Sequence, residues 1–447
     1  MNSINKLYDL IESTYQTQPT EVYDDYNIKR GLRNPDGTPV MAGITAIGDV
    51  RGYYMQDGER IPVDGKLKYR GINVTTIVEN CQKEKRFGFE EVAFLLIFGF
   101  LPSRALLAEF NEVLANYRTL PDNFPEDMIL KAPSPNIMIK LARSVLALYT
   151  YDPNPDDISL RNLLRQSIEL IARLPTMAVY GYYAKISYYD NQSLILHHPQ
   201  ENLSTAENFL YLLRADNQYT SFEAELLDLL LMLHAEHGGG NNSTFATRVV
   251  SSTGTDTYSA IAAAVGSLKG PKHGGANQQV MGMVDYFKST LHDITNENEV
   301  KDLIAKIIKK EAYDQKGLIY GMGHAVYTKS DPRAVLLKEK AAQMAKIKGF
   351  EEEFELYSLI EKLTPEVFAE IKGDSKMISA NVDLYSGFVY KMLGIPSSLY
   401  TPLFAISRIV GWCAHRIEEV ITCNRIIRPG YKSIYKENKY VPIDERE

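Results

Sequence analysis

The spacing of apolar residues over most of the chain constrains the fold more than any other feature. From residue 89 to about residue 411, apolar side chains recur every three or four positions, which is typical of α-helices. The segment 300–308 has one apolar face with lysines outside it, and the segment 222–233 is apolar on nearly every side, which predicts a buried helix. Glycines and prolines separate these segments. We therefore expect a fold that is almost wholly α.

One region departs from this pattern. Between residues 31 and 71, glycines, prolines and two Asp-Gly pairs alternate with short runs of Ile, Val and Tyr. Asp-Gly is a preferred pair for tight hairpin turns, so Asp57-Gly58 and Asp64-Gly65 both predict a turn between strands. The sequence predicts a small β-hairpin region near the N-terminus, added to an otherwise helical protein.

Length and charge exclude several classes of protein. A chain of 447 residues is too long for one simple core, so two domains that share a cleft are expected. The net charge of −7 gives no overall field that would attract nucleic acid or an anionic membrane. An anionic ligand must therefore be held by individual arginines.

Cysteine content and the absence of apolar spans favour a cytoplasmic protein. The three cysteines, Cys81, Cys413 and Cys423, are too few for a disulfide framework or a zinc cluster, and we interpret them as packing thiols. The first 26 residues have neither a hydrophobic signal core nor an arginine-rich transit pattern. The segment 392–407 is apolar, but it is short and broken by two prolines, so we expect no membrane span.

Two histidines lie at glycine-rich boundaries, where backbone can approach a ligand closely. His237 precedes three glycines, and His273 lies between Gly270 and Gly274-Gly275. A helix is expected after Gly275, and the positive end of its dipole would keep the imidazole of His273 neutral and able to donate a hydrogen bond. Such a donor suits a developing enolate oxygen. Considered alone, His273 could equally be a satisfied core histidine.

A third histidine follows an alternation of glycines. His324 comes directly after Gly321-Met322-Gly323, and Arg333 follows nine residues later. A dinucleotide-binding loop would need a third glycine and a preceding strand, both of which are missing, and the chain has no phosphate-binding P-loop. A turn that presents His324 beside Arg333 would fit an anionic carbonyl substrate.

One acidic residue lies in an apolar context. Asp383 is flanked by Val382 and Leu384, and partial burial would raise the pKa of its carboxyl and make it a stronger base toward carbon acids. The alternative is an ordinary helix cap or a solvated acid. Alone, none of these three residues identifies a site.

Together, the three segments resemble a known family. GPKHGGAN around His273, GMGHAVYTKSDPR around His324 and NVDLYSGF around Asp383 are similar, in this order, to the three catalytic motifs of the citrate synthase family. The resemblance extends from LKYRG at 67–71 through LHAEHGGGNNST to IIRPGYKSIY. It implies an all-α homodimer, with a large helical domain (1–275 and 388–447) and a small helical domain (276–387) that closes over the cleft.

The resemblance also implies a reaction. Family members condense acetyl-CoA with oxaloacetate and water to give citrate and CoA, a step of the tricarboxylic acid cycle. Carried over by motif, Asp383 abstracts a proton from the acetyl methyl and His273 donates a hydrogen bond to the thioester oxygen. His324 polarises the ketone of oxaloacetate. A weak carbon acid needs base and oxyanion donor together, and each is typically worth roughly 10²-fold or more in rate.

The remaining site residues follow from the same motifs. The resemblance implies that the carboxylates of oxaloacetate are bound by His237, Arg333 and Arg408, and by Arg428 supplied from the partner subunit. For coenzyme A, which is a substrate, it implies Leu318, Ile319, Gly321, Gly323 and Lys376. Some relatives have an arginine for a CoA phosphate where this chain has Thr328, and Lys329 is the nearest substitute. No metal and no further cofactor are implied.

Several alternatives remain open. A 2-methylcitrate synthase, which uses propionyl-CoA, would need the same catalytic groups, because one methylene changes only the volume of the pocket. The pair His234 and His237 could suggest a metal-dependent hydrolase, but the spacing differs from the usual zinc helix. An esterase would need a Gly-x-Ser-x-Gly elbow, which the chain lacks. A non-catalytic scaffold would be expected to have lost the catalytic groups.

Overall fold

The structure is a computed structural model of the chain and describes residues 3–14, 20–373, 377–423, 425–434 and 437–446. Its backbone contacts define two compact units, one of residues 45–426 and one of residues 1–44 with 427–447. The smaller unit contains the helices α1 (Ser3–Thr14) and α2 (Thr20–Asp25) and the short 3₁₀ turns η1 (Arg30–Leu32) and η5 (Ile443–Glu445). The candidate site lies in the larger unit.

The only sheet in the described residues is the predicted β region. Strands β1 (Gly48–Gln56), β2 (Glu59–Tyr69) and β3 (Ile72–Asn73) pair antiparallel in that order. Asp57 and Gly58 have φ of 52° and 85°, as a tight hairpin turn requires, so the first predicted turn is confirmed.

The second Asp-Gly pair does not form a turn, and that prediction is wrong. Asp64 and Gly65 lie inside β2. An added Cβ at Gly65 would lie 2.2 Å from the carbonyl oxygen of Ser330, so the glycine is needed for a close approach of two backbones. The Ser330 hydroxyl also accepts a hydrogen bond from the Gly65 amide at 3.1 Å. The hairpin is thereby fastened to the segment that follows His324.

Helices make up the rest of the larger unit, as the apolar spacing predicts. The first half contains α3 (Val74–Lys83), α4 (Phe89–Phe98), α5 (Arg104–Tyr117), η2 (Pro125–Leu130), α6 (Ile137–Leu148), η3 (Tyr149–Tyr151), α7 (Leu160–Tyr189), α8 (Thr205–Leu213), α9 (Ser221–His234), α10 (Asn242–Ser251) and α11 (Thr257–Leu268). The second half contains α12 (Ala276–Thr290), α13 (Glu297–Ile308), α14 (Pro332–Lys348), α15 (Glu351–Lys372), α16 (Val382–Met392), η4 (Ser397–Leu399) and α17 (Tyr400–Thr422). The fold class, all-α with a small β region, is confirmed.

Helix ends follow from local sequence. The α4 helix ends at Gly99, whose φ is 87°. Glycine adopts this left-handed conformation without the steric strain that a side chain would cause. The α14 helix begins with Asp331 as its cap and proline at its first position. Asp256 caps α11 by accepting a hydrogen bond from the amide of Ser259 at 2.7 Å. These three boundaries therefore depend on residues that are next to one another in the sequence.

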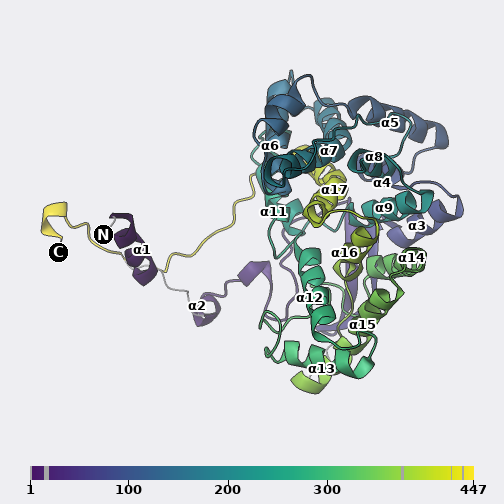
Figure 1. Ribbon diagram of the computed structural model, residues 1–447. Helices are drawn as coiled ribbons and strands as arrows, with labels where there is room; N and C mark the ends of the chain where they lie inside the picture. The colour runs from purple at the N-terminus through teal and green to yellow at the C-terminus, as the bar shows by residue number, and fades with distance from the viewer. Residues whose placement is uncertain (1–2, 15–19, 374–376, 424, 435–436, 447) are drawn as a thin grey trace. The chain divides into compact units, whose positions relative to one another are not determined.

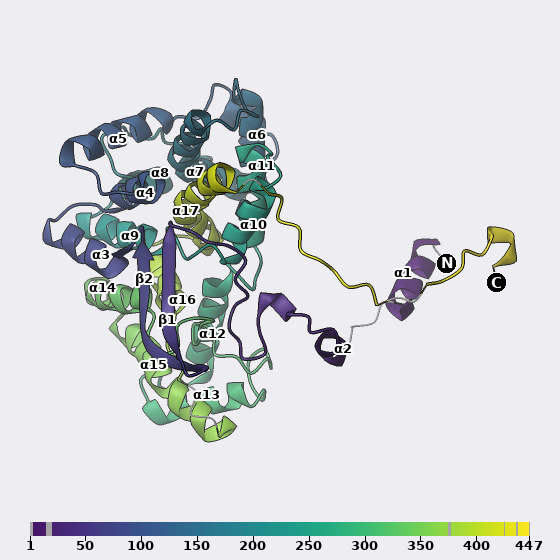
Figure 2. The same cartoon turned by 180° about the vertical axis from the view of Figure 1, so that it is seen from behind.

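Helix α17 forms the centre of the larger unit (Figures 1 and 2). It packs against α4, α7, α9, α10 and α11, and its side chains from Tyr400 to Ala414 are almost all buried. Helices α12, α13 and α15 lie at the opposite end of this unit from α5, α6 and α7 (Figure 1), and α14 and α16 pack side by side between them. No helix in the described part of the chain is long and apolar enough to span a membrane.

Candidate active site

The candidate site forms where one helix ends and two others begin. Helix α9 ends at His234, and the irregular segment 235–241 that follows carries His237. Helices α14 and α16 begin beside it with Arg333 and Asp383 in their first turns. Helix α17 passes the same point with Arg408. Helix termini expose unpaired backbone groups and leave room for ligands, so they are favourable positions for a binding site.

A cluster of rings joins two of the predicted histidines. The rings of His237 and His324 are 5.2 Å apart and nearly perpendicular, and the ring of Tyr327 stacks on His324 at 4.7 Å. The guanidinium carbon of Arg333 lies 5.6 Å from the centre of the same tyrosine ring. Tyr327 is fully buried, and its hydroxyl has no hydrogen-bond partner among the described residues. This tyrosine was not predicted as a site residue from the sequence, although it lies only three residues after His324.

Backbone hydrogen bonds fix the proton of His324. Its Nδ1 accepts hydrogen bonds from the amides of Val326 at 3.0 Å and Tyr327 at 3.1 Å. A nitrogen that accepts two N–H donors carries no proton, so the imidazole is neutral and its proton is on Nε2. The side chain can therefore donate a hydrogen bond through Nε2.

Asn381 connects the His324 turn to Asp383. Its amide Nδ2 donates to the carbonyl of Gly323 at 2.8 Å, and its backbone N–H donates to the carbonyl of Gly321 at 2.9 Å. Its Oδ1 accepts from the amide of Asp383 at 3.0 Å and thereby caps α16. An added Cβ at Gly321 would lie 2.9 Å from the Cα of Leu384, so only glycine permits this packing. Asparagine is a preferred residue at helix N-termini, and this preference is the only local sequence signal for Asn381.

Asp383 has an unusual acidity. Burial raises the pKa of its carboxyl to about 6; the guanidinium of Arg333 opposes this shift, and the carboxylate of Asp331 adds to it. The direction agrees with the prediction of a carboxylate that is a stronger base than usual. At neutral pH the group is still mainly ionised, as a proton-abstracting base must be.

The two predicted arginines differ in their partners. Arg333 forms a bidentate pair with Asp331, with Nη2–Oδ2 and Nε–Oδ1 distances of 2.7 and 3.0 Å. Arg408 donates from Nε to the carbonyl of His234 at 2.6 Å, but its Nη1 and Nη2 are buried without a hydrogen-bond partner among the described residues. The same is true of Nε2 of His237. Buried polar atoms without partners are costly, and a guanidinium with two unpaired donors fits an anionic ligand.

Charge and burial keep His237 neutral. Burial lowers the pKa of its imidazole well below the usual value, and the guanidinium of Arg333 lowers it further. Burial also lowers the pKa of Arg408 to about 10, while the carboxylate of Glu236 opposes this shift. At neutral pH the group therefore presents one neutral imidazole and two guanidinium cations.

His273 lies in the turn before α12, as the sequence predicts. Its Nε2 lies 3.0 Å from the hydroxyl of Ser243 and 3.4 Å from the backbone nitrogen of the same residue, which donates to it. The indole of Trp412 donates to that hydroxyl at 3.1 Å. Burial lowers the pKa of His273 to about 4, and Arg408 adds to the effect. Its imidazole is therefore neutral at pH 7, as predicted. The main cause is burial, whereas the prediction rested on the dipole of the following helix.

The residues assigned to coenzyme A occupy varied positions. Leu318 is half exposed, whereas Ile319 is buried. Gly321 and Gly323 both have positive φ, of 83° and 86°. Lys329 is exposed and pairs with Asp64 at 3.2 Å.

Two further predicted residues are not placed at this site. Lys376 lies outside the described residues. Arg428 is among the described residues, but it belongs to the smaller unit of residues 1–44 and 427–447 and not to the unit that contains the site. The assignment of both residues remains a prediction.

The residues behind the metal-hydrolase alternative have other contacts. His234 donates from Nδ1 to the carbonyl of Leu230 at 2.9 Å, and its ring packs edge-on against Phe404 at 4.6 Å. Among the described residues, no group of three or more His, Cys, Asp or Glu side chains could hold a metal ion. Nothing in this part of the chain therefore favours the hydrolase.

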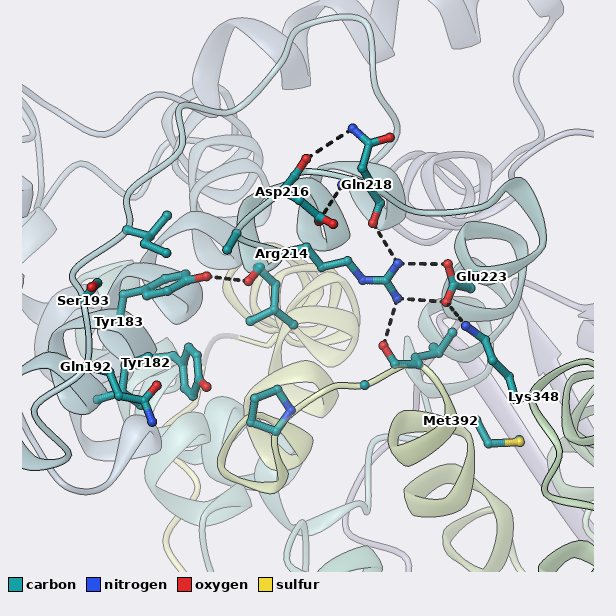
Figure 3. A pocket seen from close by; sticks show the side chains of 17 residues that line it. Tyr182, Tyr183, Gln192, Ser193, Arg214, Asp216, Gln218, Glu223, Lys348 and Met392 are labelled. Atoms are coloured by element: carbon teal, nitrogen blue, oxygen red, sulfur yellow. Dashed lines mark hydrogen bonds and ion pairs between the residues drawn. The ribbon is translucent and has the colours of Figure 1, made fainter.

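A separate cavity of about 880 Å³ lies at the other end of α9 (Figure 3). It is lined by residues of α7, the loop after α8, the start of α9 and the ends of α14 and α16, including Tyr183, Arg214, Glu223, Lys348 and Leu393. None of the predicted site residues lines it. The cavity is therefore not the candidate active site.

Fold and geometry together define a class of protein. Neutral imidazoles, guanidinium groups and a carboxylate of raised pKa, gathered at helix ends of an almost wholly helical chain, are typical of an enzyme that acts on a small anionic carbonyl compound. Residues 37–430 match the family model described as citrate synthase, C-terminal domain. The chain belongs to the citrate synthase family.

Individual relatives agree with this assignment. A citrate synthase from Synechocystis is 36% identical over 384 residues, which cover 86% of this chain and 89% of the relative. The 2-methylcitrate synthase 1 of Corynebacterium glutamicum is 33% identical over 429 residues, which cover 94% of this chain and 99% of the relative. Citrate synthase from Thermoplasma acidophilum, solved as a ternary complex with carboxymethyl coenzyme A and oxaloacetate, has a TM-score of 0.76 and is 28% identical in sequence. The match covers 94% of this chain and 99% of that structure. The chain is therefore an enzyme that transfers an acyl group, as a citrate or 2-methylcitrate synthase.

Proposed function

We propose that this protein is a citrate synthase that condenses acetyl-CoA with oxaloacetate and water to give citrate and CoA. The observation that carries the proposal is the set of buried polar atoms without partners, the donors Nη1 and Nη2 of Arg408 together with Nε2 of His237, beside a carboxylate of raised pKa. A dianionic keto acid supplies the acceptors that these donors lack. The Thermoplasma relative, whose structure contains oxaloacetate, supports this choice of ligand.

Oxaloacetate is held by its two carboxylates. Arg408 and His237 bind through their free donors, and Arg333, already fixed by Asp331, presents the remaining face of its guanidinium. Arg428 completes the site from the partner subunit of a homodimer. The bound dianion lies near His324, whose Nε2 proton is directed by the two amides on Nδ1 to donate to the ketone oxygen.

Asp383 and His273 activate the acetyl group. Asp383 removes a proton from the methyl carbon, and the thioester oxygen that gains negative charge receives a hydrogen bond from His273. Because Nε2 of His273 accepts from the amide of Ser243, the proton of the neutral ring is on Nδ1, which becomes the donor. The enol carbon then attacks the ketone carbon, and His324 supports the alkoxide that forms.

Release of citrate requires hydrolysis. Water adds to the thioester carbon of the citryl-CoA intermediate, the carbon–sulfur bond breaks, and the thiolate of CoA takes up a proton. Coenzyme A is bound by the segment from Leu318 to Gly323, with Lys376 and Lys329 near its phosphates. Lys329 must leave its exposed pair with Asp64 to do so, which costs little in water.

Two domains close over this site. We propose the division into residues 1–275 with 388–447 and residues 276–387. Helices α12, α13, α14, α15 and α16 pack mainly on one another, which supports their movement as one body. Closure would bring Arg333 and Asp383 of the small domain against His237 and Arg408 of the large one and exclude water from the reaction.

The alternative substrate is propionyl-CoA, which would give 2-methylcitrate. It is favoured by the Corynebacterium relative, which matches 94% of this chain. The deciding experiment measures thiol release from acetyl-CoA and propionyl-CoA with and without oxaloacetate. We expect release only with oxaloacetate and a higher kcat/KM for acetyl-CoA. A preference for propionyl-CoA would instead identify a 2-methylcitrate synthase, and release without oxaloacetate would contradict both.

Substitution of the base tests the mechanism. We expect Asp383→Ala to lower kcat by at least about 100-fold, because no other carboxylate takes its place. Oxaloacetate should still bind, which can be followed by the fluorescence of Trp412, the only tryptophan of the chain. Turnover close to that of the wild type would contradict the assignment of Asp383 as the base.

A further inference from the structure

A carboxylate that the proposed mechanism does not use lies directly before His237. Glu236 is completely buried between α9 and α17. Its Oε1 accepts hydrogen bonds from the amide of Gly238 and, at 3.0 Å, from Nε2 of His415. Its Oε2 has no hydrogen-bond partner among the described residues. A buried ionised carboxylate is costly, so its presence needs a reason.

Two glycines make room for this carboxylate. An added Cβ at Gly411, on α17, would lie 2.5 Å from Oε2 of Glu236, and one at Gly48, in β1, would lie 2.8 Å from Oε1. Heavy atoms cannot approach so closely, so any side chain at either position would displace the carboxylate. The absence of side chains at Gly48 and Gly411 therefore leaves the space that the carboxylate of Glu236 occupies.

Hydrogen bonds fix the protonation of the groups behind Glu236. Nδ1 of His415 accepts from Nε and Nη2 of Arg248 at 3.1 and 2.7 Å, so its proton is on Nε2 and donates to Glu236. His415 is therefore neutral and adds no positive charge. Arg248 is itself neutralised by Glu418 and Glu419. Glu236 thus receives no full counter-charge from this side.

Among the described residues, no carboxylate is hydrogen-bonded to the nearby cation Arg408. It is on α17 three residues before Gly411, and its Nε donates to the carbonyl of His234, two residues before Glu236. Of the charged groups that face it, Arg333 is a second cation with its own partner Asp331, and Asp383 is the base. Tyr69, from β2, is neutral because burial raises its pKa. Glu236 has the largest charge effect on the pKa of Arg408 and raises it against the effect of burial.

We propose that Glu236 is the buried counter-ion of Arg408: it holds the turn that carries His237 and supplies the negative charge that the guanidinium needs until a dianion binds. This role rests on the proposed binding of oxaloacetate at Arg408. The ligand then brings a second negative charge to the same cation. Glu236 is thus a positioning residue that keeps the anion site charged and open in the resting enzyme.

The test compares thermal unfolding with and without oxaloacetate. Glu236→Gln keeps the shape and the acceptor oxygen but removes the charge, so without ligand its midpoint should fall by at least about 3 °C. Saturating oxaloacetate should remove at least about half of that deficit, because the dianion replaces the missing charge. A deficit of the same size with and without oxaloacetate would overturn the proposal, since a merely structural role predicts that result.

Glu418→Gln is the matched control. It removes a carboxylate from the same network, but one that acts on Arg248 and not on Arg408, so its deficit should not change with oxaloacetate. If wild-type protein is not stabilised by oxaloacetate, the proposed function fails, and this result is distinguishable from failure of the counter-ion.

A second variant covers the case in which Glu236→Gln does not fold. The double variant Glu236→Gln, Arg408→Leu lacks both charges. It should be soluble and folded if the two residues neutralise each other in the wild type. A double variant as insoluble as Glu236→Gln alone would overturn the proposal.

Discussion

At the scale of single residues, burial and neighbouring charge adapt ordinary side chains to different tasks. Burial lowers the pKa of His237 and His273, which keeps both imidazoles neutral, and the same burial raises the pKa of Asp383. The direction differs because burial always disfavours the charged form, which is the protonated form of histidine and the deprotonated form of aspartate. One environment thus provides both neutral donors and a strengthened base.

The pH dependence of activity follows from these values. The pKa of Asp383 is raised to about 6, so the active carboxylate predominates above pH 6 and is lost as pH falls through 6. We expect kcat/KM, measured between pH 5 and pH 8, to fall on the acid side with an apparent pKa near 6. The pKa of His273, about 4, is too low to cause this loss. A kcat/KM that does not fall between pH 8 and pH 5 would contradict the raised pKa of Asp383.

At the scale of secondary structure, one ion-pair group fastens three helices at the end remote from the site (Figure 3). Glu223, in the first turn of α9, accepts bidentate hydrogen bonds from Arg214 at 2.9 and 3.0 Å and one from Lys348 at 2.7 Å. Arg214 also donates to the carbonyl of Leu393, at the end of α16, at 2.9 Å. Lys348 is the last residue of α14. The other ends of these three helices carry the candidate site residues.

Loss of the lysine tests whether this group supports closure. Lys348 lies in the proposed small domain and Glu223 in the large one, so their pair would favour the closed arrangement. We expect Lys348→Met to raise the KM for oxaloacetate roughly two- to five-fold, as for a partly exposed ion pair, with kcat changed by less than about two-fold. Lys346→Met, on the same turn and without a described ion pair, is the control. A fall in kcat without a change in KM would contradict this interpretation.

Close packing between α9 and α17 gives a second prediction at this scale. An added Cβ at Gly411 would lie 2.5 Å from the carbonyl oxygen of Ala235, so Gly411→Ala should destabilise the fold by about 1–3 kcal/mol although alanine favours helices. Gly266→Ala, in α11 with open space around it, should be neutral or stabilise by about 0.5–1 kcal/mol. Denaturant unfolding of both variants provides the measurement. Equal changes in the free energy of unfolding of the two variants would show that helix propensity, and not packing, determines the effect of alanine at Gly411.

At the scale of the whole molecule, the proposed function requires a second copy of the chain. Helix α6 exposes Ile139 and Leu146, at 40% and 47% of their surface, seven residues apart on one face. Such side chains are available for contact with another subunit. The assignment of Arg428 to the partner's site depends on this assembly.

Complementation tests the shared site. Arg428→Ala and Asp383→Ala subunits should each be nearly inactive as homodimers. A mixed dimer joined through a two-fold interface would contain one intact site of two and should have up to about half of wild-type activity. A randomly paired, equal mixture, in which about half of the dimers are mixed, should therefore reach up to about a quarter. Activity of refolded mixtures, compared with either variant refolded alone, is the measurement. No recovery in mixtures shown to contain mixed dimers would exclude a shared site.

The sequence by itself determined the helical class, the first hairpin turn and the caps of helices such as α11 and α14, because these depend on local spacing and on residues next to one another. It also brought His237, His324, Arg333 and Asp383 forward as candidates, through motifs that resemble the citrate synthase family. The contradicted detail, a turn at Asp64-Gly65, has a long-range cause: the glycine allows Ser330, 265 residues away, to approach the strand.

Only the tertiary structure decided what surrounds these residues. Three features depend on contacts between segments distant in sequence: Tyr327 beside His237, Asn381 joining the His324 turn to α16, and Glu236 beside Arg408. The protonation of a buried group is set by such neighbours and by the loss of water around it, neither of which is written in local sequence. A sequence can thus name the groups of a site, but their charge states arise only when the chain has folded around them.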